Sequence, residues 1–425
     1  MLFRSEDKKA LLPDWDKLKA MYNAVYALMN DGKVLAASVV KEGGAAATVA
    51  KMSFGNKIGF KFAKDLTNDE LFAPLSASLV VELADGAELD TSILHYELGT
   101  TTDDGNITVN GAVLTIDELI EEWTSKLESV FPTKAPCPEN QVEIPLYKER
   151  NTSSPVIKTA KPKVFIPVFP GTNCEIDTAR SFVKAGAEPK LLVVRNLTPN
   201  AIEETIEEMV RLINDSQMIM LPGGFSGGDE PDGSGKFIAT TFRNPRISEA
   251  VNELLKNRDG LMLGICNGFQ ALIKLGLVPY GEIVDLKETD PTLTFNTIGR
   301  HISRMAYTRV TSVKSPWFSS VNAGDIFAVP ISHGEGRFVA NDDVLKKLIE
   351  NGQVATQYVS PDGKQACDIE YNPNGSICAI EGITSPDGRV LGKMGHSERK
   401  GDNLYFNVPF EKDQKIFESG VNYFK

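Results

Sequence analysis

The sequence predicts an α/β protein with an open, mostly parallel sheet and a nucleophile elbow, preceded by a smaller α+β domain. Buried apolar segments alternate with helical segments up to residue 280, which is typical of parallel strands covered on both faces. A cysteine flanked by glycines follows the fourth of these strands. The length of 425 residues exceeds what one hydrophobic core usually supports. We therefore expect an α+β domain over residues 1–131, a linker over 132–160 and the α/β domain over 161–425.

The first segment mixes helical and extended patterns. Apolar spacing predicts a helix from Trp15 to Met29, and small residues predict a second helix from Ala45 to Met52. Acidic residues in the first turns favour a third helix from Thr115 to Leu127. Strands are expected over residues 34–40, 79–83 and 93–98. This alternation indicates an α+β domain.

Residues 132–162 lose all periodicity and contain six prolines among Asn, Ser, Thr and Lys. This composition is typical of a linker that lies extended over a surface. A regular series of strands and helices follows it, with Thr198 as the cap of the second helix. The strands are expected over residues 164–169, 190–194, 218–221 and 260–265, and the helices over 174–185 and 199–213. Beyond Gly281 shorter strands are expected within residues 285–313, 326–330 and 353–358.

Composition and charge exclude several classes of protein. The chain has 42% hydrophobic and 24% charged residues, as an ordinary globular protein does. A net charge of −12 and a pI near 5.1 argue against nucleic acid or an anionic membrane as the main partner. No apolar run reaches the roughly 20 residues that span a bilayer, and no signal-peptide pattern follows Met1. Five scattered cysteines without a C-x-x-C pair argue against a disulfide framework or a zinc knuckle, so we expect a protein of the reducing cytoplasm.

The run Gly264-Ile265-Cys266-Asn267-Gly268 predicts a sharp strand-to-helix turn that carries a cysteine nucleophile. Glycines are needed two residues either side because a Cβ there would crowd the opposite limb of the turn. Such a turn holds Cys266 in a sparsely populated backbone region, at a cost of roughly 1–3 kcal/mol. The Asn267 N–H opens the next helix and can stabilise a thiolate or an oxyanion. A buried, unreactive cysteine in an ordinary turn is the alternative.

The loop Pro222-Gly-Gly-Phe-Ser-Gly-Gly-Asp229 follows the third strand and should lie at the same sheet edge as Cys266. Its glycines allow backbone N–H groups to point into a site and complete an oxyanion hole, where one donor is worth about 2.7–4 kcal/mol. A phosphate-binding P-loop is excluded, because Glu230 stands where glycine is needed and Phe237 where Ser or Thr must follow the lysine. A mobile loop without a catalytic role stays open.

His396 and Glu398 form the second candidate group. A carboxylate two residues after a histidine can lie on the same face of an extended segment and fix the tautomer of the ring, whose other nitrogen then serves the thiol as a base. His333 and Glu335 form a second His-x-Glu pair that competes for this role, or contacts a substrate or another domain. His95 and His301 are expected to be exposed or to make a local hydrogen bond, and Cys174 is expected to be structural.

Together, the P-G-G loop, the G-x-C-x-G-x-Q elbow and the later H-x-E resemble a triad-type (class I) glutamine amidotransferase. More narrowly, four motifs resemble the glutaminase part of phosphoribosylformylglycinamidine synthases, which perform an amidotransferase step of de novo purine synthesis. The motifs are Phe169-Pro-Gly-Thr-Asn-Cys174, Pro222-Gly-Gly-Phe-Ser226, Cys266-Asn-Gly-Phe-Gln270 and Ser332-His-Gly-Glu-Gly-Arg-Phe338. The resemblance covers residues 161–425.

The resemblance implies a role for each matching residue. Cys266 would attack the glutamine carboxamide, His396 would act as base and then as acid, and Glu398 would orient His396. Such enzymes commonly carry proline between the histidine and the glutamate, where this chain has Ser397. The remaining roles are an oxyanion hole at Gly224 and Asn267, substrate binding at Gly223, Phe225 and Gln270, and a substrate or interdomain contact at His333 and Arg337.

The N-terminal part is similar to the C-terminal half of an aminoimidazole-ribonucleotide-synthetase-like domain, over Ser38–Ala45 and Met52–Asn56. In the large single-chain synthases this half-domain precedes the glutaminase. The resemblance implies that the synthetase segments that use ATP, Mg and formylglycinamide ribonucleotide are absent from this chain. The chain would then bind glutamine, hold no cofactor and supply ammonia to them. The alternatives are a stand-alone cysteine hydrolase of the elbow-containing α/β superfamily and a non-catalytic interaction domain.

Overall fold

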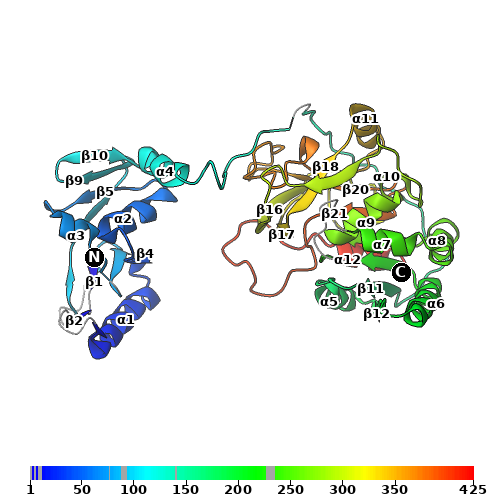
Figure 1. Ribbon diagram of the computed structural model, residues 1–425, viewed down its shortest axis with the longest axis horizontal. Helices are drawn as coiled ribbons and strands as arrows, with labels where there is room; N and C mark the ends of the chain where they lie inside the picture. Colours follow the sequence, from blue (N-terminus) through cyan, green and yellow to red (C-terminus); the bar gives the residue numbers. More distant parts are fainter. Residues whose placement is uncertain are drawn as a thin grey trace. The chain divides into compact units, whose positions relative to one another are not determined.

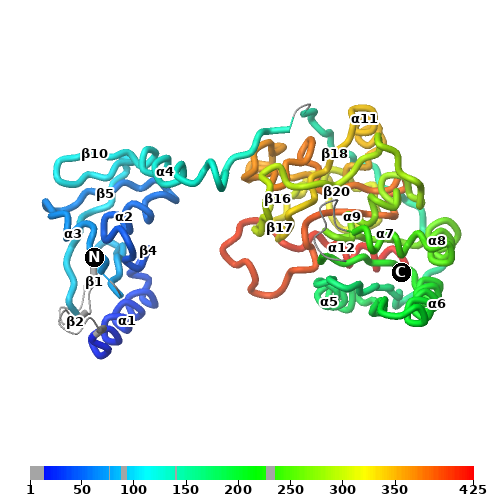
Figure 2. Tube along the Cα trace, in the orientation of Figure 1, coloured from blue at the N-terminus to red at the C-terminus, as the bar shows by residue number. Residues whose placement is uncertain are grey.

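The computed structural model (Figures 1 and 2) describes residues 2–3, 6–7, 12–75, 77–87, 93–138, 141–225 and 235–425. The chain forms two compact units, residues 1–133 and 134–425. Much of the segment that the sequence predicts as a linker is held against the second unit. The Tyr147 N–H donates to Thr311 O at 2.9 Å, and the Arg150 guanidinium donates to Phe318 O at 2.9 Å.

In the first unit, the described strands form two four-stranded sheets and one short hairpin. The first sheet has the order β4 (Val34–Val39), β6 (Leu79–Leu83), β1 (Leu2–Phe3), β7 (His95–Tyr96). The second has the order β10 (Ala112–Thr115), β9 (Asn106–Val109), β5 (Gly59–Phe62), β8 (Gly99–Thr102). The hairpin pairs β2 (Glu6–Asp7) with β3 (Leu12–Pro13), and the described helices are α1 (Trp15–Asn30), α2 (Gly44–Phe54), α3 (Asn68–Phe72) and α4 (Ile116–Ser125).

The sequence predicts the longer elements of this unit and misses the short ones. Helices α1, α2 and α4 and strands β4 and β6 are confirmed to within a few residues. The strand predicted over residues 93–98 is too long, because only β7 lies within it and pairs with β1. Strands β5, β8, β9 and β10 have four residues each, which is too short for a periodic signal.

A nine-stranded sheet forms the centre of the second unit, and it confirms the predicted α/β class. Its first five strands are mutually parallel: β12 (Glu188–Val193), β11 (Lys163–Val168), β13 (Met218–Leu221), β14 (Leu261–Ile265) and β21 (Val390–Lys393). An antiparallel half continues it with β20 (Ile380–Thr384), β19 (Val354–Tyr358), β16 (Ile302–Val310) and β17 (Ile326–His333). A separate two-stranded sheet pairs β15 (Thr292–Phe295) with β18 (Glu335–Val339).

Helices pack against this sheet (Figure 1), and the predicted ones are confirmed. Thr198 caps α6 as expected, because its hydroxyl accepts the Ala201 N–H at 3.2 Å. Among the described residues, no helix is both long and apolar enough to cross a bilayer. The α-helices of this unit are α5 (Glu175–Ala185), α6 (Pro199–Asp215), α7 (Lys236–Phe242), α8 (Pro245–Asn252), α9 (Asn267–Leu275), α10 (Leu277–Tyr280), α11 (Asp342–Glu350) and α12 (Ile416–Asn422).

The parallel half of the sheet determines where chemistry can occur. The carboxyl ends of neighbouring parallel strands lie at one edge, where such sheets bind ligands. Strands β13, β14 and β21 are direct neighbours. Their ends therefore bring together the loop at residues 222–225, Cys266 and the turn at residues 394–398.

The sequence argued against a disulfide framework, and it gave no sign of the single disulfide between Cys137 and Cys367. These two residues form a disulfide with their Cα atoms 5.3 Å apart, although 230 positions separate them in the sequence. Spacing in the sequence carries no signal for such a pair, because the tertiary fold alone brings the two segments together. The other cysteines are free and buried: Cys174, Cys266 and Cys378.

Candidate active site

Cys266 lies in a sharp turn between β14 and α9, which confirms the predicted elbow. Its backbone has φ 53° and ψ −108°, a conformation that costs a residue with a side chain roughly 1–3 kcal/mol. A Cβ on Gly264 would lie 2.7 Å from the Gly268 carbonyl carbon, and one on Gly268 would lie 2.0 Å from Leu221 O. Both glycines are therefore required sterically, as the spacing predicts.

Replacing Gly268 with alanine is expected to lower the free energy of unfolding of the second unit by about 1–3 kcal/mol, the usual cost of overpacking a core. The new methyl would meet the Leu221 carbonyl, which is backbone and cannot rotate away. Urea unfolding measures the loss. Gly401→Ala is the matched control, because its Cβ would meet only the exposed Leu404 side chain, at 3.1 Å. Equal stability of the two variants would show that the turn tolerates a side chain.

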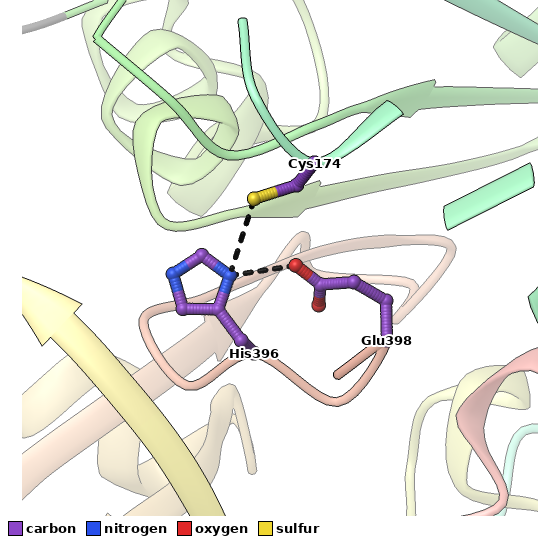
Figure 3. A group of neighbouring side chains, drawn as sticks. All are labelled: Cys174, His396 and Glu398. Carbon is purple, nitrogen blue, oxygen red and sulfur yellow. Dashed lines mark hydrogen bonds and ion pairs between the residues drawn. The ribbon is translucent and has the colours of Figure 1, made fainter. Parts of the chain in front are cut away.

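His396 and Glu398 lie in the segment that follows β21, and their side chains meet (Figure 3). His396 Nδ1 lies 2.6 Å from Glu398 Oε1, and both residues are buried. The prediction of an extended segment is wrong. The chain turns here, because the Ser397 N–H donates to Gly395 O at 3.2 Å and the Arg399 N–H donates to His396 O at 3.1 Å. The turn still brings the imidazole and the carboxylate together.

The electrostatics of the pair favour a proton on the imidazole. Burial acts to lower the pKa of His396, but the Glu398 carboxylate and the sulfurs of Cys266 and Cys174 outweigh it and raise this pKa well above its ordinary value. Burial acts to raise the pKa of Glu398, yet the charge of His396 holds it below its usual range. Both shifts have the sign of a buried imidazolium–carboxylate pair.

Backbone hydrogen bonds fix the relative position of Cys266 and His396. Residue Ile265 of β14 lies opposite Lys393 of β21. The Cys266 N–H donates to Lys393 O at 2.8 Å, and the His396 N–H donates to Pro330 O at 2.9 Å. Among the described residues, His396 Nε2 makes no well-formed hydrogen bond, although the Cys266 sulfur is close enough to help raise the pKa of His396. Such a bond is often absent without substrate and forms in the reacting complex.

The loop after β13 approaches the imidazole closely. A Cβ on Gly223 would lie 2.7 Å from His396 Cε1, so only glycine permits this approach. Gly224 has φ 147° and forms an isolated antiparallel bridge with Thr172. The N–H groups of Phe225 and Asn173 make the two hydrogen bonds of this bridge, at 2.8 and 3.1 Å. The Gly224 N–H takes no part in them. The rest of the predicted loop, Ser226 to Asp229, lies outside the described residues, as does Glu230.

The expected substrate-binding residues lie around the same sheet edge. Asn267 is the first residue of α9, so its N–H is at the positive end of the helix dipole. Gln270 is buried, and its Nε2 donates to Glu335 Oε2 at 3.1 Å. Phe225 is partly exposed, and its ring centroid lies 6.4 Å from that of His301.

His333 is buried at the end of β17, and burial together with the charges of His396 and His301 lowers its pKa to about 3. Neither of its ring nitrogens has a hydrogen-bond partner among the described residues. Glu335 binds Gln270 rather than His333. The geometry therefore favours His396 over His333 as the partner of a carboxylate. Arg337 lies on β18, opposite Thr294.

Cys174 was expected to be structural, but its sulfur lies against the candidate site (Figure 3). It is 3.8 Å from His396 Nδ1 and accepts a hydrogen bond from Arg399 Nη2 at 3.2 Å. Cys174, His396 and Glu398 offer three metal-ligand atoms within 4.8 Å of one another. The guanidinium on the sulfur and the short contact between His396 and Glu398 both oppose a bound cation. The sequence analysis considered Cys174 only as a structural residue, and it missed Arg399 as a neighbour of the site.

Two further contacts support the turn that carries His396. The Ser397 hydroxyl donates to Gln414 Oε1 at 2.6 Å, and Ser397 is buried. Lys393 and Glu381 form a fully buried ion pair next to the turn. The sequence analysis missed both contacts. The available signal for the ion pair was one charged residue inside each of two apolar runs, 380–383 and 390–394.

Residues 161–424 match the family of CobB/CobQ-like glutamine amidotransferase domains. The chain is 35% identical over 240 residues to the phosphoribosylformylglycinamidine synthase subunit PurQ of Methanococcus maripaludis, which covers 56% of this chain and 82% of that subunit. It is 32% identical over 284 residues to the PurQ subunit of Treponema denticola, which covers 62% of this chain and 99% of that subunit.

One chain of a solved structure of PurLQS from Thermotoga maritima is 29% identical in sequence to this protein. The match covers 62% of this protein and 100% of the PurLQS chain, with a TM-score of 0.45. The family match covers more than half of this chain, and the PurQ relatives are matched over most of their own length. The chain therefore belongs to the CobB/CobQ-like glutamine amidotransferases and, among them, to the family of the PurQ glutaminase subunit of phosphoribosylformylglycinamidine synthase.

Proposed function

We propose that Cys266 of this chain hydrolyses glutamine, with His396 and Glu398 as its catalytic partners, and that the ammonia goes to a synthetase partner. The observation that carries this proposal is a strained cysteine turn at the same sheet edge as a buried imidazole–carboxylate pair. Such a group is the general arrangement of an activated nucleophile, its base and an orienting carboxylate.

In the first half of the reaction, His396 would take the proton of the Cys266 thiol, and the resulting thiolate would attack the carboxamide carbon of glutamine. As the C–S bond forms, the carbonyl π electrons move to oxygen, and the N–H groups of Gly224 and Asn267 would stabilise this oxyanion. The raised pKa of His396 keeps a proton on the ring for the leaving group. His396 would transfer this proton to the amide nitrogen, and the C–N bond would break to release ammonia and leave a thioester.

In the second half, water would attack the thioester while His396 takes one of its protons. The C–S bond then breaks, and the sum of the two halves is glutamine plus water giving glutamate plus ammonia. Glu398 would stabilise the imidazolium in both halves through the 2.6 Å contact. The side chain of Gln270 and the backbone around Gly223 and Phe225 would hold the substrate.

In the complete enzyme the ammonia would amidate formylglycinamide ribonucleotide, with ATP converted to ADP and phosphate. The names of the PurQ relatives support this assignment. ATP and Mg²⁺ belong, in this proposal, to synthetase segments outside residues 161–425. Residues 1–131 would be part of that synthetase, because Ser38–Ala45 and Met52–Asn56 are similar to half of an aminoimidazole-ribonucleotide-synthetase-like domain.

A glutamine-analogue electrophile tests the proposed nucleophile on the 425-residue chain. We expect alkylation of Cys266 alone among the free cysteines, because the reactive geometry belongs to the elbow, and we expect excess glutamine to slow it. Peptide mass spectrometry identifies the modified cysteine. Equal modification of Cys174 or Cys378, or no protection by glutamine, would rule out a glutamine site at Cys266.

A further inference from the structure

We propose that the buried Lys393–Glu381 ion pair is the positioning element of the glutaminase site, because it holds the peptide at Gly395 and with it the catalytic histidine. The inference rests on the proposed role of Cys266 and His396. Neither Lys393 nor Glu381 touches the reacting atoms, so both would act through the backbone that carries those two residues.

The pair encloses one residue from both sides. Lys393 Nζ lies 3.1 Å from Glu381 Oε1, and both side chains are 0% exposed. Glu381 Oε1 accepts the Gly395 N–H at 2.5 Å, and Lys393 Nζ donates to Gly395 O at 2.6 Å. The Thr356 hydroxyl donates to the other carboxylate oxygen. Both polar groups of Gly395, the residue before His396, are therefore bound to this one ion pair.

The space around Gly395 is also too small for a side chain. A Cβ there would lie 2.7 Å from Val329 Cγ2 and about equally close to both charged groups, at 3.0 Å from Glu381 Oε1 and 3.1 Å from Lys393 Nζ. The peptide at Gly395 thus fits between the sheet and the ion pair only as glycine. A change in the pair must move this peptide or leave its polar groups without partners.

Lys393 also connects the histidine to the nucleophile. Its side chain binds Gly395 O, while its own carbonyl accepts the Cys266 N–H at 2.8 Å. Cys266 follows β14 and His396 follows the end of β21, and no backbone hydrogen bond joins the two residues directly. Lys393 therefore contacts both turns, one through its carbonyl group and the other through its side chain.

The stability of the fold gives no reason for a buried ion pair at this place. Taking two charges out of water costs as much as their attraction returns, and well-packed apolar residues are often as stabilising. Removal of one partner alone is strongly destabilising, because the other charge stays buried and unpaired. An apolar pair could not make the two polar contacts with the peptide at Gly395, and these contacts are the function that we assign to the ion pair.

Two double variants separate positioning from folding. Glu381→Leu with Lys393→Met removes both charges and both contacts to Gly395. Glu381→Gln with Lys393→Met removes the same charges but keeps an oxygen that accepts the Gly395 N–H. Single variants are expected to lower the urea midpoint most, because each leaves one charge buried and unpaired, whereas the double variants lose only polar partners of Gly395 and should be less destabilised.

The readout is the rate at which the glutamine-analogue electrophile alkylates Cys266 in the 425-residue chain, measured across pH. We expect alkylation of the Leu/Met variant to be about 10- to 100-fold slower, the loss that follows when a catalytic group is misplaced by about 1 Å. We also expect the alkaline limb of its rate–pH profile to move to lower pH. The Gln/Met variant should recover much of the rate. A control with Arg389→Met and Asp259→Asn removes two ion pairs of Arg389, with Asp259 at 3.2 Å and Asp387 at 2.7 Å, without touching Gly395, and should keep the parent rate of alkylation.

The outcomes are distinguishable. If the folded Leu/Met variant reacts at the parent rate with an unmoved pH profile, the ion pair is structural and the inference is wrong. If Gln/Met is as slow as Leu/Met, the contact to Gly395 is not what positions the histidine, and the inference is again overturned. If the parent chain itself is not alkylated at Cys266, the proposed function fails before this inference is reached.

Discussion

Replacing Cys266 with alanine is expected to abolish glutamine hydrolysis, with a fall in kcat on the order of 10⁶-fold, the loss seen when a hydrolytic triad loses its nucleophile. The attacking sulfur is gone, and no other described cysteine occupies a strained turn at this sheet edge: Cys174 caps α5, and Cys378 is buried elsewhere. Glutamate release by this chain, combined with the rest of the synthase, measures the effect.

The same variant should still support synthesis from free ammonia. In the proposed scheme the site around Cys266 only supplies ammonia, so an external supply bypasses it. Cys378→Ala is the control, since it removes another buried free thiol that lies outside the site, and it should leave glutamine-driven synthesis unchanged. If Cys266→Ala also abolishes the ammonia-driven reaction, Cys266 serves the synthetase or the fold rather than glutamine hydrolysis.

The parts of the site that could be predicted are those with strong local chemistry. A sharp strand-to-helix turn requires Gly264 and Gly268, and the structure puts backbone atoms where their Cβ atoms would stand. His396 and Glu398 are two residues apart, so any compact local conformation lets them meet. The turn replaced the expected extended segment without changing this outcome.

The parts that could not be predicted depend on contacts between distant segments. Cys137 and Cys367 are 230 positions apart, and Cys174 lies 222 positions from His396. Lys393 and Glu381 are each a single charged residue in a different apolar run, and only the pairing of β20 with β21 brings the two charges together. Spacing and periodicity describe one segment at a time, so they carry no information on which segments become neighbours.

The antiparallel half of the sheet was predicted only as separate short strands. Strand β19 is buried throughout, whereas β16 and β17 alternate buried and partly buried residues over part of their length. The order of these strands in the sheet also differs from their order in the chain. Connectivity of this kind is decided by packing of the whole unit. The parallel half was accessible because strand, helix and strand follow one another directly there.

The second large effect is expected at Glu398. Glu398→Gln keeps a side chain that can accept a hydrogen bond from His396 Nδ1 but removes the negative charge. Because this carboxylate is the largest influence raising the pKa of His396 against burial, the variant should lower that pKa. The imidazolium that protonates the departing nitrogen is then lost at a lower pH, so the alkaline limb of the kcat profile should move to lower pH.

We expect kcat at its optimum to fall by roughly 10²–10⁴-fold, the range that general acid–base catalysis contributes. The pH dependence of glutamate release measures both effects. Glu335→Gln is the matched control, because it changes the carboxylate of the other His-x-Glu pair, which binds Gln270 instead of a histidine. It should alter KM and leave the alkaline limb in place. An alkaline limb that follows Glu335 and not Glu398 would transfer the acid–base role from His396 to His333, and with it the assignment of the catalytic pair.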